Sequence, residues 1–185
     1  MLLSKAYSHF VEASNEWHQQ QNIKMCCWAQ QDDSSPCIVR RIDEQQVEWQ
    51  PVLQQPAADF SNVELALECE LHPDIKQFYS QYYGANLAAD HQRGKLALLM
   101  VWSAADLPRL QENIIGHLIM KRRLKQRETV FFAVTEDDNI MLSVLNATGE
   151  VYLESVGKDV QQKVADNLAD FLNQLRPAPY SPDFD

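Results

Sequence analysis

The stretch TVFFAVTEDDNIMLSVLNATGEVYLESV, residues 129–156, contains three short runs of β-branched, aromatic and aliphatic residues. The runs are TVFFAV (129–134), NIMLSVLN (139–146) and VYLESV (151–156). Each has the length and composition of a strand, and polar turns at 136–139 and 147–150 connect them. Because short turns join antiparallel neighbours, this stretch predicts the centre of a largely antiparallel sheet.

The sequence on either side of this stretch alternates between strand and helix patterns. GKLALLMVW (94–102) has the pattern of a buried strand, and residues 103–125 that of the longest helix, with Leu107, Leu110, Ile114 and Leu118 as its apolar stripe. Ser103 or Asp106 is suited to cap this helix. Residues 159–175 repeat apolar side chains at helical spacing and stop before Pro177, which predicts a last helix.

The N-terminal part of the chain shows the same mixture. Residues 2–21 predict an amphipathic helix, and residues 37–51 a β-hairpin around a polar turn. Residues 61–71 and 73–84 predict two short helices, the second beginning at Pro73 and ending at Gly84. Without a repeating strand–helix–strand rhythm, the chain is predicted to be a single α+β domain, with a largely antiparallel sheet flanked by helices.

The charge distribution is uneven. The formal net charge is -10, yet residues 121–127 contain five cations and no acid, so the other 178 residues total -15. Such an acidic body repels nucleic acid and attracts basic partners. The five cations are Lys121, Arg122, Arg123, Lys125 and Arg127.

Two interpretations account for this basic segment. Cations in the last turn of a helix are stabilised by its dipole, by roughly 0.3 to 1 kcal/mol each. The remaining charges are available to anionic lipid headgroups, where each basic residue contributes about 1 kcal/mol of attraction. The segment is therefore either a solvated helix end or a membrane-surface contact.

The N-terminal residues lack the apolar run of a signal peptide, and no window is long and apolar enough for a membrane-spanning helix. Together with the four cysteines, this favours a cytoplasmic protein with reduced thiols.

Catalytic and metal-binding motifs are scarce. Cys26 and Cys27 are adjacent instead of having the C-x-x-C spacing of a zinc site, and the five histidines are scattered. No phosphate-binding loop or nucleophile-elbow motif occurs in the sequence. No cofactor or metal is therefore expected. A Cys–His nucleophile pair, formed by residues distant in sequence, remains the enzymatic alternative.

Several segments together resemble one known family. They are SPCI (35–38), VEWQP (47–51), NVELALE (62–68), QENIIGHLI (111–119), KRRLK (121–125), SVLNATGEV (143–151) and NLADFLNQLRP (167–177). This combination resembles the Syd family of bacterial SecY-interacting proteins, which is related to the SUKH superfamily of α+β immunity and interaction proteins. The similarity extends from about Trp17 to Pro177, so residues 1–177 are assigned to one domain and residues 178–185 to a flexible tail.

The resemblance implies a non-enzymatic protein that associates peripherally with the cytoplasmic side of the inner membrane. There it would bind basic cytosolic loops of the SecY channel through an acidic concave surface and monitor or regulate SecYEG assembly. The acidic composition agrees with such a partner, because the cytoplasmic loops of membrane proteins are rich in Lys and Arg. The alternative within the same superfamily is an immunity protein that neutralises a basic toxin.

The residues expected at the acidic surface lie near predicted sheet edges and the matched segments. They are Asp43, Glu44, Glu48, Glu64, Glu68, Glu150 and Glu154. Glu64 and Glu68 are four residues apart and are expected to share a helix face, where a cation would relieve their repulsion. Trp49 and Trp102 are expected in the core. Lys121, Arg122, Arg123, Lys125 and Arg127 are expected to face the membrane, away from the acidic surface.

Overall fold

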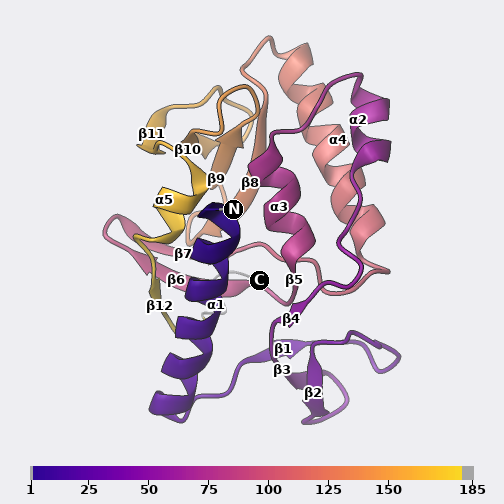
Figure 1. The fold of residues 1–185 in the computed structure, drawn as a ribbon, viewed down its shortest axis with the longest axis vertical. Helices are drawn as coiled ribbons and strands as arrows, with labels where there is room; N and C mark the ends of the chain where they lie inside the picture. The colour runs from indigo at the N-terminus through magenta and orange to yellow at the C-terminus, as the bar shows by residue number, and fades with distance from the viewer. Residues whose placement is uncertain (1, 181–185) are drawn as a thin grey trace.

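A seven-stranded antiparallel sheet is the centre of the computed structural model, which describes residues 2–180 (Figure 1). The strand order is β11-β10-β9-β8-β7-β6-β12. The strands are β6 (Leu87–His91), β7 (Gly94–Leu98), β8 (Thr129–Thr135), β9 (Ile140–Leu145), β10 (Val151–Ser155), β11 (Gln162–Ala165) and β12 (Arg176–Pro177). The prediction of an α+β fold with a largely antiparallel sheet is confirmed.

The three runs of residues 129–156 form the adjacent strands β8, β9 and β10, as predicted. In their register Val144 lies opposite Val130 on one side and Val151 on the other. Opposite residues in paired strands point to the same face, so these three valines share one face, and all are at most 1% exposed. This face carries the main core.

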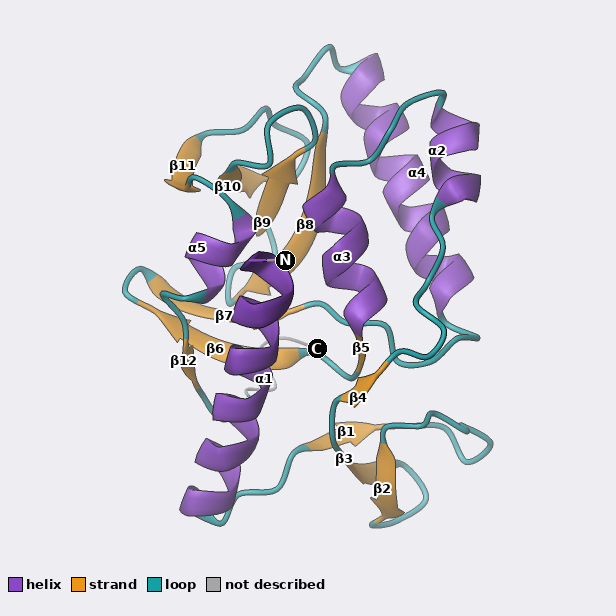
Figure 2. Ribbon diagram, viewed as in Figure 1, coloured by secondary structure: helices purple, strands orange, loops and turns teal. Residues whose placement is uncertain are grey.

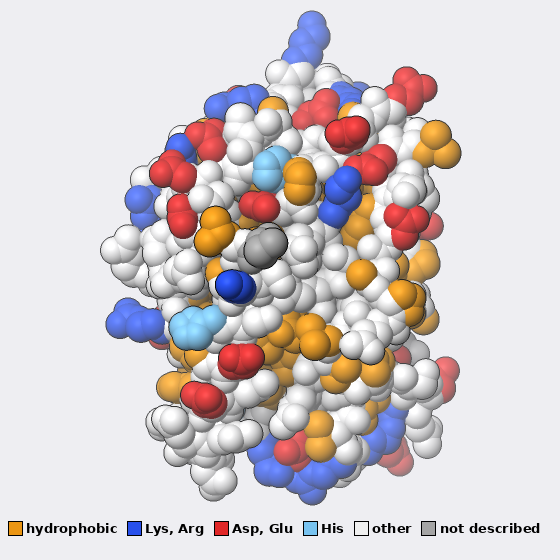
Figure 3. Space-filling model, in the orientation of Figure 1, with side chains coloured by type: hydrophobic (Ala, Val, Ile, Leu, Met, Phe, Trp, Pro, Cys, Tyr) orange, Lys and Arg blue, Asp and Glu red, His pale blue; other side chains and the backbone are white. Residues whose placement is uncertain are grey.

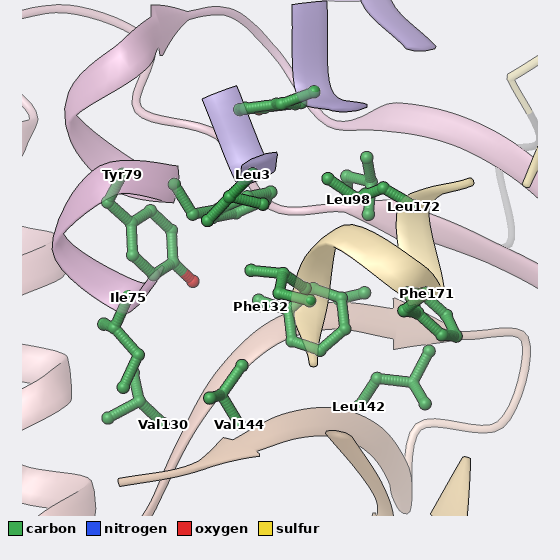
Figure 4. Close-up of a cluster of buried hydrophobic side chains, with 14 of the residues drawn as sticks. Leu3, Ile75, Tyr79, Leu98, Val130, Phe132, Leu142, Val144, Phe171 and Leu172 are labelled. Carbon is green, nitrogen blue, oxygen red and sulfur yellow. The ribbon is translucent and has the colours of Figure 1, made fainter. Parts of the chain in front are cut away.

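Three helices cover this face. They are α1 (Leu2–Gln21), α3 (Pro73–Gln81) and α5 (Leu168–Leu172) (Figures 1 and 2). Figure 4 shows Leu3, Tyr79 and Phe171 from these helices packed over Phe132 and Val144 of the sheet. The predicted helix 2–21 is confirmed, and Pro73 lies in the first turn of α3 as expected.

Two further helices, α4 (Leu107–Arg123) and α2 (Ser61–Leu67), pack against each other beside the sheet (Figure 2). The prediction that residues 103–125 form the longest helix is wrong, since α4 has 17 residues and α1 has 20. Asp106 stands at the N-cap of α4, but its carboxylate accepts a hydrogen bond from Arg109 instead of capping the helix.

The predicted last helix, 159–175, is wrong in its first half. Residues 162–165 form β11, which pairs with β10 at the edge of the sheet. The helix α5 begins only after Asn167, whose side chain accepts a hydrogen bond from the backbone N–H of Asp170. Gln162, Lys163 and Ala165 are good helix formers, but pairing with the edge of β10 satisfies the backbone of this segment in the sheet and overrides its local helix propensity.

Smaller sheets complete the fold below the main sheet in Figure 1. A three-stranded sheet has the order β1-β3-β2, and a two-stranded sheet joins β4 to β5. The strands are β1 (Cys26–Trp28), β2 (Ile38–Arg41), β3 (Gln46–Trp49), β4 (Val52–Leu53) and β5 (Tyr82–Tyr83). The β2–β3 pair confirms the predicted hairpin. Pairing of Tyr82 with Leu53 ends α3 at Gln81, before the predicted Gly84.

The predicted flexible tail, residues 178–185, lies largely outside the described residues, which end at Tyr180. Its first residue, Ala178, is 4% exposed and packs against Ala88 and Ala97.

Candidate functional site

The acids predicted on the first hairpin lie at the lower end of the molecule, on the three-stranded sheet (Figure 1). Glu48 forms ion pairs with Lys24 at 2.8 Å and Arg40 at 2.6 Å, and hydrogen bonds from these two cations lower the pKa of its carboxyl group. Asp43 accepts two backbone N–H groups of its own turn. Glu44 is exposed. Two of these three carboxylates therefore stabilise the hairpin itself.

The second pair, Glu64 and Glu68, does not share a helix face. Glu68 lies just beyond the end of α2 with a left-handed φ of 50°, so the helical i,i+4 relation was a wrong expectation. Glu64 forms an ion pair with Lys76 of α3 at 2.7 Å and accepts the backbone N–H of Leu71 at 2.9 Å. The hydrogen bond from Lys76 is the main cause of the lowered pKa of Glu64. Glu64 thus ties α2 to α3, whereas Glu68 is exposed.

The third pair is split between surface and interior. Glu150 forms an ion pair with Lys163 at 2.5 Å, and the hydrogen bond from Lys163 lowers the pKa of this carboxyl group. Glu154 points to the opposite face of the sheet from the main core and is 0% exposed. The expectation that Glu154 lines an open acidic surface is wrong.

Glu154 is paired instead with a cation that was expected at the membrane. Lys121 of α4 is also 0% exposed; its ammonium forms an ion pair with Glu154 Oε1 and donates to the carbonyl of Lys158 at 2.7 Å. Thr129 and Ser143 donate their hydroxyl groups to Glu154 Oε2 at 2.8 and 2.7 Å. The surface role predicted for Lys121 is therefore wrong, because its side chain is buried between α4 and the sheet.

The spacing of α4 explains this burial. Ile114, Leu118 and Lys121 follow the i, i+4, i+7 pattern of one helical stripe, and all three are 0% exposed. The apolar stripe predicted from the sequence thus continues into the first residue of the basic segment. This spacing was the available signal that Lys121 faces inward.

The other four cations of the basic segment are all exposed, and two of them are held in ion pairs. Arg122 forms an ion pair with Glu128 at 2.8 Å and donates to the carbonyl of Leu67 at 2.7 Å. Arg127 forms an ion pair with Asp159 at 3.2 Å and lies 5.7 Å from the ring centre of Tyr152. Arg123 and Lys125 are exposed. A membrane contact for these four exposed cations remains a prediction.

Tertiary contacts bring two acidic segments together at the upper end of the molecule. The backbone N–H of His72 donates to Asn146 Oδ1 at 2.8 Å, and Asn146 Nδ2 donates to the carbonyl of Glu70 at 2.9 Å. The segment 64–74 therefore lies beside the β9–β10 turn that carries Glu150.

We call this surface the acidic end and define it by Glu64, Glu68, Glu70, Asp74, Glu150 and Asp166. Lys76 and Lys163 are held in ion pairs with these carboxylates, and Arg122 donates to the carbonyl of Leu67, next to Glu68, so this cation is not separated from the acidic surface as expected. Figure 3 shows acidic side chains over the upper half of the visible face, interspersed with Lys and Arg side chains. Glu70, Asp74 and Asp166 were not among the predicted residues. The acid-rich composition of 64–74 was the signal for the first two.

A cleft of about 760 Å³ lies at the other end, beside the three-stranded sheet. Its walls include Trp28, which is 62% exposed, and the pair Trp49 and Trp102, whose rings meet edge to face at 6.4 Å. Trp49 is 3% exposed, which confirms it as a core residue, but Trp102 is only partly buried. The cleft also contains Met100, His18 and Cys26.

His18 and Cys26 line this one cleft, so the enzymatic alternative can be judged on their surroundings. His18 Nδ1 lies 2.8 Å from the carbonyl of Ser14, so this nitrogen must carry the proton to form the hydrogen bond. Burial, followed by the charge of Glu48, raises the pKa of the Cys26 thiol. A raised pKa reduces the thiolate fraction, which is opposite to the activation that a nucleophilic cysteine needs.

Among the helices within residues 2–180, none has the length and apolar character required to cross a membrane. The same residues hold no group of three or more His, Cys, Asp or Glu side chains arranged to hold a metal ion.

These features define a class: a single-domain α+β protein with a curled antiparallel sheet, an acidic end and an aromatic cleft. The chain matches the family model described as Syd protein (SUKH-2) over residues 3–177, and it belongs to the Syd family.

Its relatives include Protein Syd of Pseudoalteromonas atlantica, 43% identical over 150 residues, which are 80% of this chain and 81% of the relative. Protein Syd of Colwellia psychrerythraea is 44% identical over 150 residues, 76% of this chain and 75% of the relative. Protein Syd of Yersinia pestis is 47% identical over 143 residues, 77% and 78% of the two chains.

Proposed function

We propose that this protein is a non-enzymatic binding protein that recognises basic cytosolic loops of SecY and monitors or regulates SecYEG assembly. The observation that carries the proposal is the match to the Syd family along nearly the whole chain. The net charge of -10 supports it, since SecY loops that carry excess Lys and Arg are complementary to an acidic surface. The protein would work in the cytoplasm, at the inner face of the bacterial inner membrane, without a cofactor and without binding nucleic acid.

The acidic end is our candidate for the loop-binding surface, in place of the wider set of acids expected from the sequence. Glu68 and Glu70 are exposed there, and no ion pair involves them among the described residues. Both are therefore available to an incoming cation without breaking an internal contact. The attraction should accelerate association and weaken as salt is added.

The test is binding of the purified protein to SecYEG at low and high salt, with Glu68→Lys and Glu70→Lys. A matched control is Asp138→Lys, which makes the same change in net charge. Asp138 lies in the β8–β9 turn, at the opposite end of β9 from the turn beside the acidic end.

Salt-sensitive binding that both acidic-end variants weaken, and Asp138→Lys does not, is the expected result. If all three variants weaken binding equally, only net charge matters and the acidic end is not the site. If the wild-type protein does not bind SecYEG at low salt, the SecY proposal is wrong, and the SUKH-type alternative, neutralisation of a basic toxin, should be tested next.

A further inference from the structure

Within residues 2–180, strand β1 pairs with another strand along one edge only, the edge that faces β3. The backbone N–H of Trp49 donates to Met25 O at 3.0 Å, and that of Ala29 donates to Gln45 O at 2.9 Å. Because bonded and non-bonded pairs alternate in an antiparallel ladder, the backbone groups of Cys26 and Trp28 point away from β3. Among residues 2–180, the strand order β1-β3-β2 places no strand on that side. An unpaired edge is a template for another extended chain.

The aromatic cleft lies along this edge. Its lining includes all three residues of β1, only Trp49 from β3 and none from β2. The facing wall is formed by residues 84–88, Met100 and residues 178–180. A segment paired with β1 would therefore enter a cleft that is already formed, with protein on both sides.

The walls favour a large apolar side chain. Trp28 on β1 is 62% exposed, which is high for so large an apolar side chain. Trp102 and Met100 line the same cleft and are partly buried. Exposed tryptophans at the mouth of a preformed concave site are typical anchors of protein interfaces.

The charges at the cleft favour a segment with basic flanks. The lining cations Lys24 and Arg109 are already paired with Glu48 and Asp106, at 2.8 and 2.7 Å. The cleft itself is therefore nearly balanced, while the protein around it has a net charge of -10. An acidic segment would be repelled on approach and a basic one attracted.

We propose that an extended segment of a cytosolic SecY loop adds as a further strand to the free edge of β1, with a large apolar side chain in the aromatic cleft and basic residues outside it. This inference rests on the proposed function and adds a contact separate from the acidic end. Backbone hydrogen bonds to Cys26 and Trp28 would set the register, and the tryptophan-lined walls would select the side chain.

Backbone amide exchange distinguishes strand addition from other modes of binding. Synthetic peptides that span the cytosolic loops of SecY would be added to isotope-labelled protein, and exchange followed by NMR. The amides of Cys26 and Trp28 should exchange freely without peptide and become protected with the bound one. The amide of Cys27 faces β3, so its protection should not change.

A second measurement is the affinity of Trp28→Ala for SecYEG in lipid nanodiscs. Loss of this anchor should weaken binding at least about tenfold. The matched control is Val156→Ala, since Val156 is 53% exposed, lies beside the β8–β9 turn and belongs neither to the cleft lining nor to the acidic end. Both residues are exposed, so neither change should impair folding.

If the wild-type protein binds SecYEG but the Cys26 and Trp28 amides stay unprotected, strand addition is refuted and the proposed function stands. Equal affinities of Trp28→Ala and wild type would likewise exclude the cleft as the contact. If the wild-type protein does not bind SecYEG at all, the proposed function fails, and this inference with it.

Discussion

Replacing Lys121 with methionine should lower the free energy of unfolding by about 3–5 kcal/mol at neutral pH, the usual cost of removing one partner from a buried ion pair. Two losses contribute. The Glu154 carboxylate would keep the hydroxyl donors of Thr129 and Ser143 and the His117 ring at 3.9 Å but no cation, and the carbonyl of Lys158 would lose its donor. Both partners of the pair are 0% exposed, so water cannot compensate.

The assay is urea denaturation at pH 7 of Lys121→Met, Glu154→Gln and the double variant. The double variant leaves no buried charge in this pair, and the glutamine oxygen can still accept from Thr129 and Ser143. We therefore expect a coupling energy of about 2 kcal/mol or more between the two sites. Arg123→Met is the control, because Arg123 is exposed on the same helix; its effect should be within about 0.5 kcal/mol.

A loss below about 1 kcal/mol for Lys121→Met, or additive single effects, would refute the burial of this pair. Lys121 would then be free to serve at the surface, as the sequence had suggested.

Two further predictions concern the same core and a nearby turn. Burial lowers the pKa of His117 from its usual 6.5, so the unfolded chain takes up the proton at a higher pH than the folded protein does. The free energy of unfolding should therefore fall as the pH drops below about 6.5 and level off beneath the folded pKa. Urea titrations at several pH values should show that His117→Gln loses this part of the pH dependence. Gly149→Ala should lower the melting temperature more than Gly157→Ala: both have φ near 75–80°, but only at Gly149 would the new Cβ lie 2.5 Å from the His72 ring. Gly157→Ala isolates the backbone strain, about 1–2 kcal/mol, and equal losses would show that the His72 ring moves aside.

Long periodic segments and short turn-bounded runs were predictable from the sequence because their structure depends on nearby residues. The helix 2–21 and the strands of 129–156 are examples. The strand at 162–165 was not predictable, because it forms by pairing with the edge of β10. The helical pattern within the segment gives no sign of this pairing.

The site predictions failed where burial or pairing was decided by distant residues. Lys121 and Glu154 are 33 residues apart in sequence, and only the packing of α4 on the sheet turns two apparent surface charges into a buried pair. The aromatic cleft has the same origin, since Trp28, Trp49 and Trp102 come from separate segments.

By itself, the sequence determined the fold class, the acidic character of the protein and its family, because composition, local periodicity and motif order are properties of the linear chain. Only the tertiary structure decided which charges are available to a partner and where a concave surface forms. The physical reason is that solvent exposure and ion pairing depend on contacts between segments distant in sequence: the same lysine is a surface cation on an isolated helix and a buried ion-pair partner once the sheet packs against it.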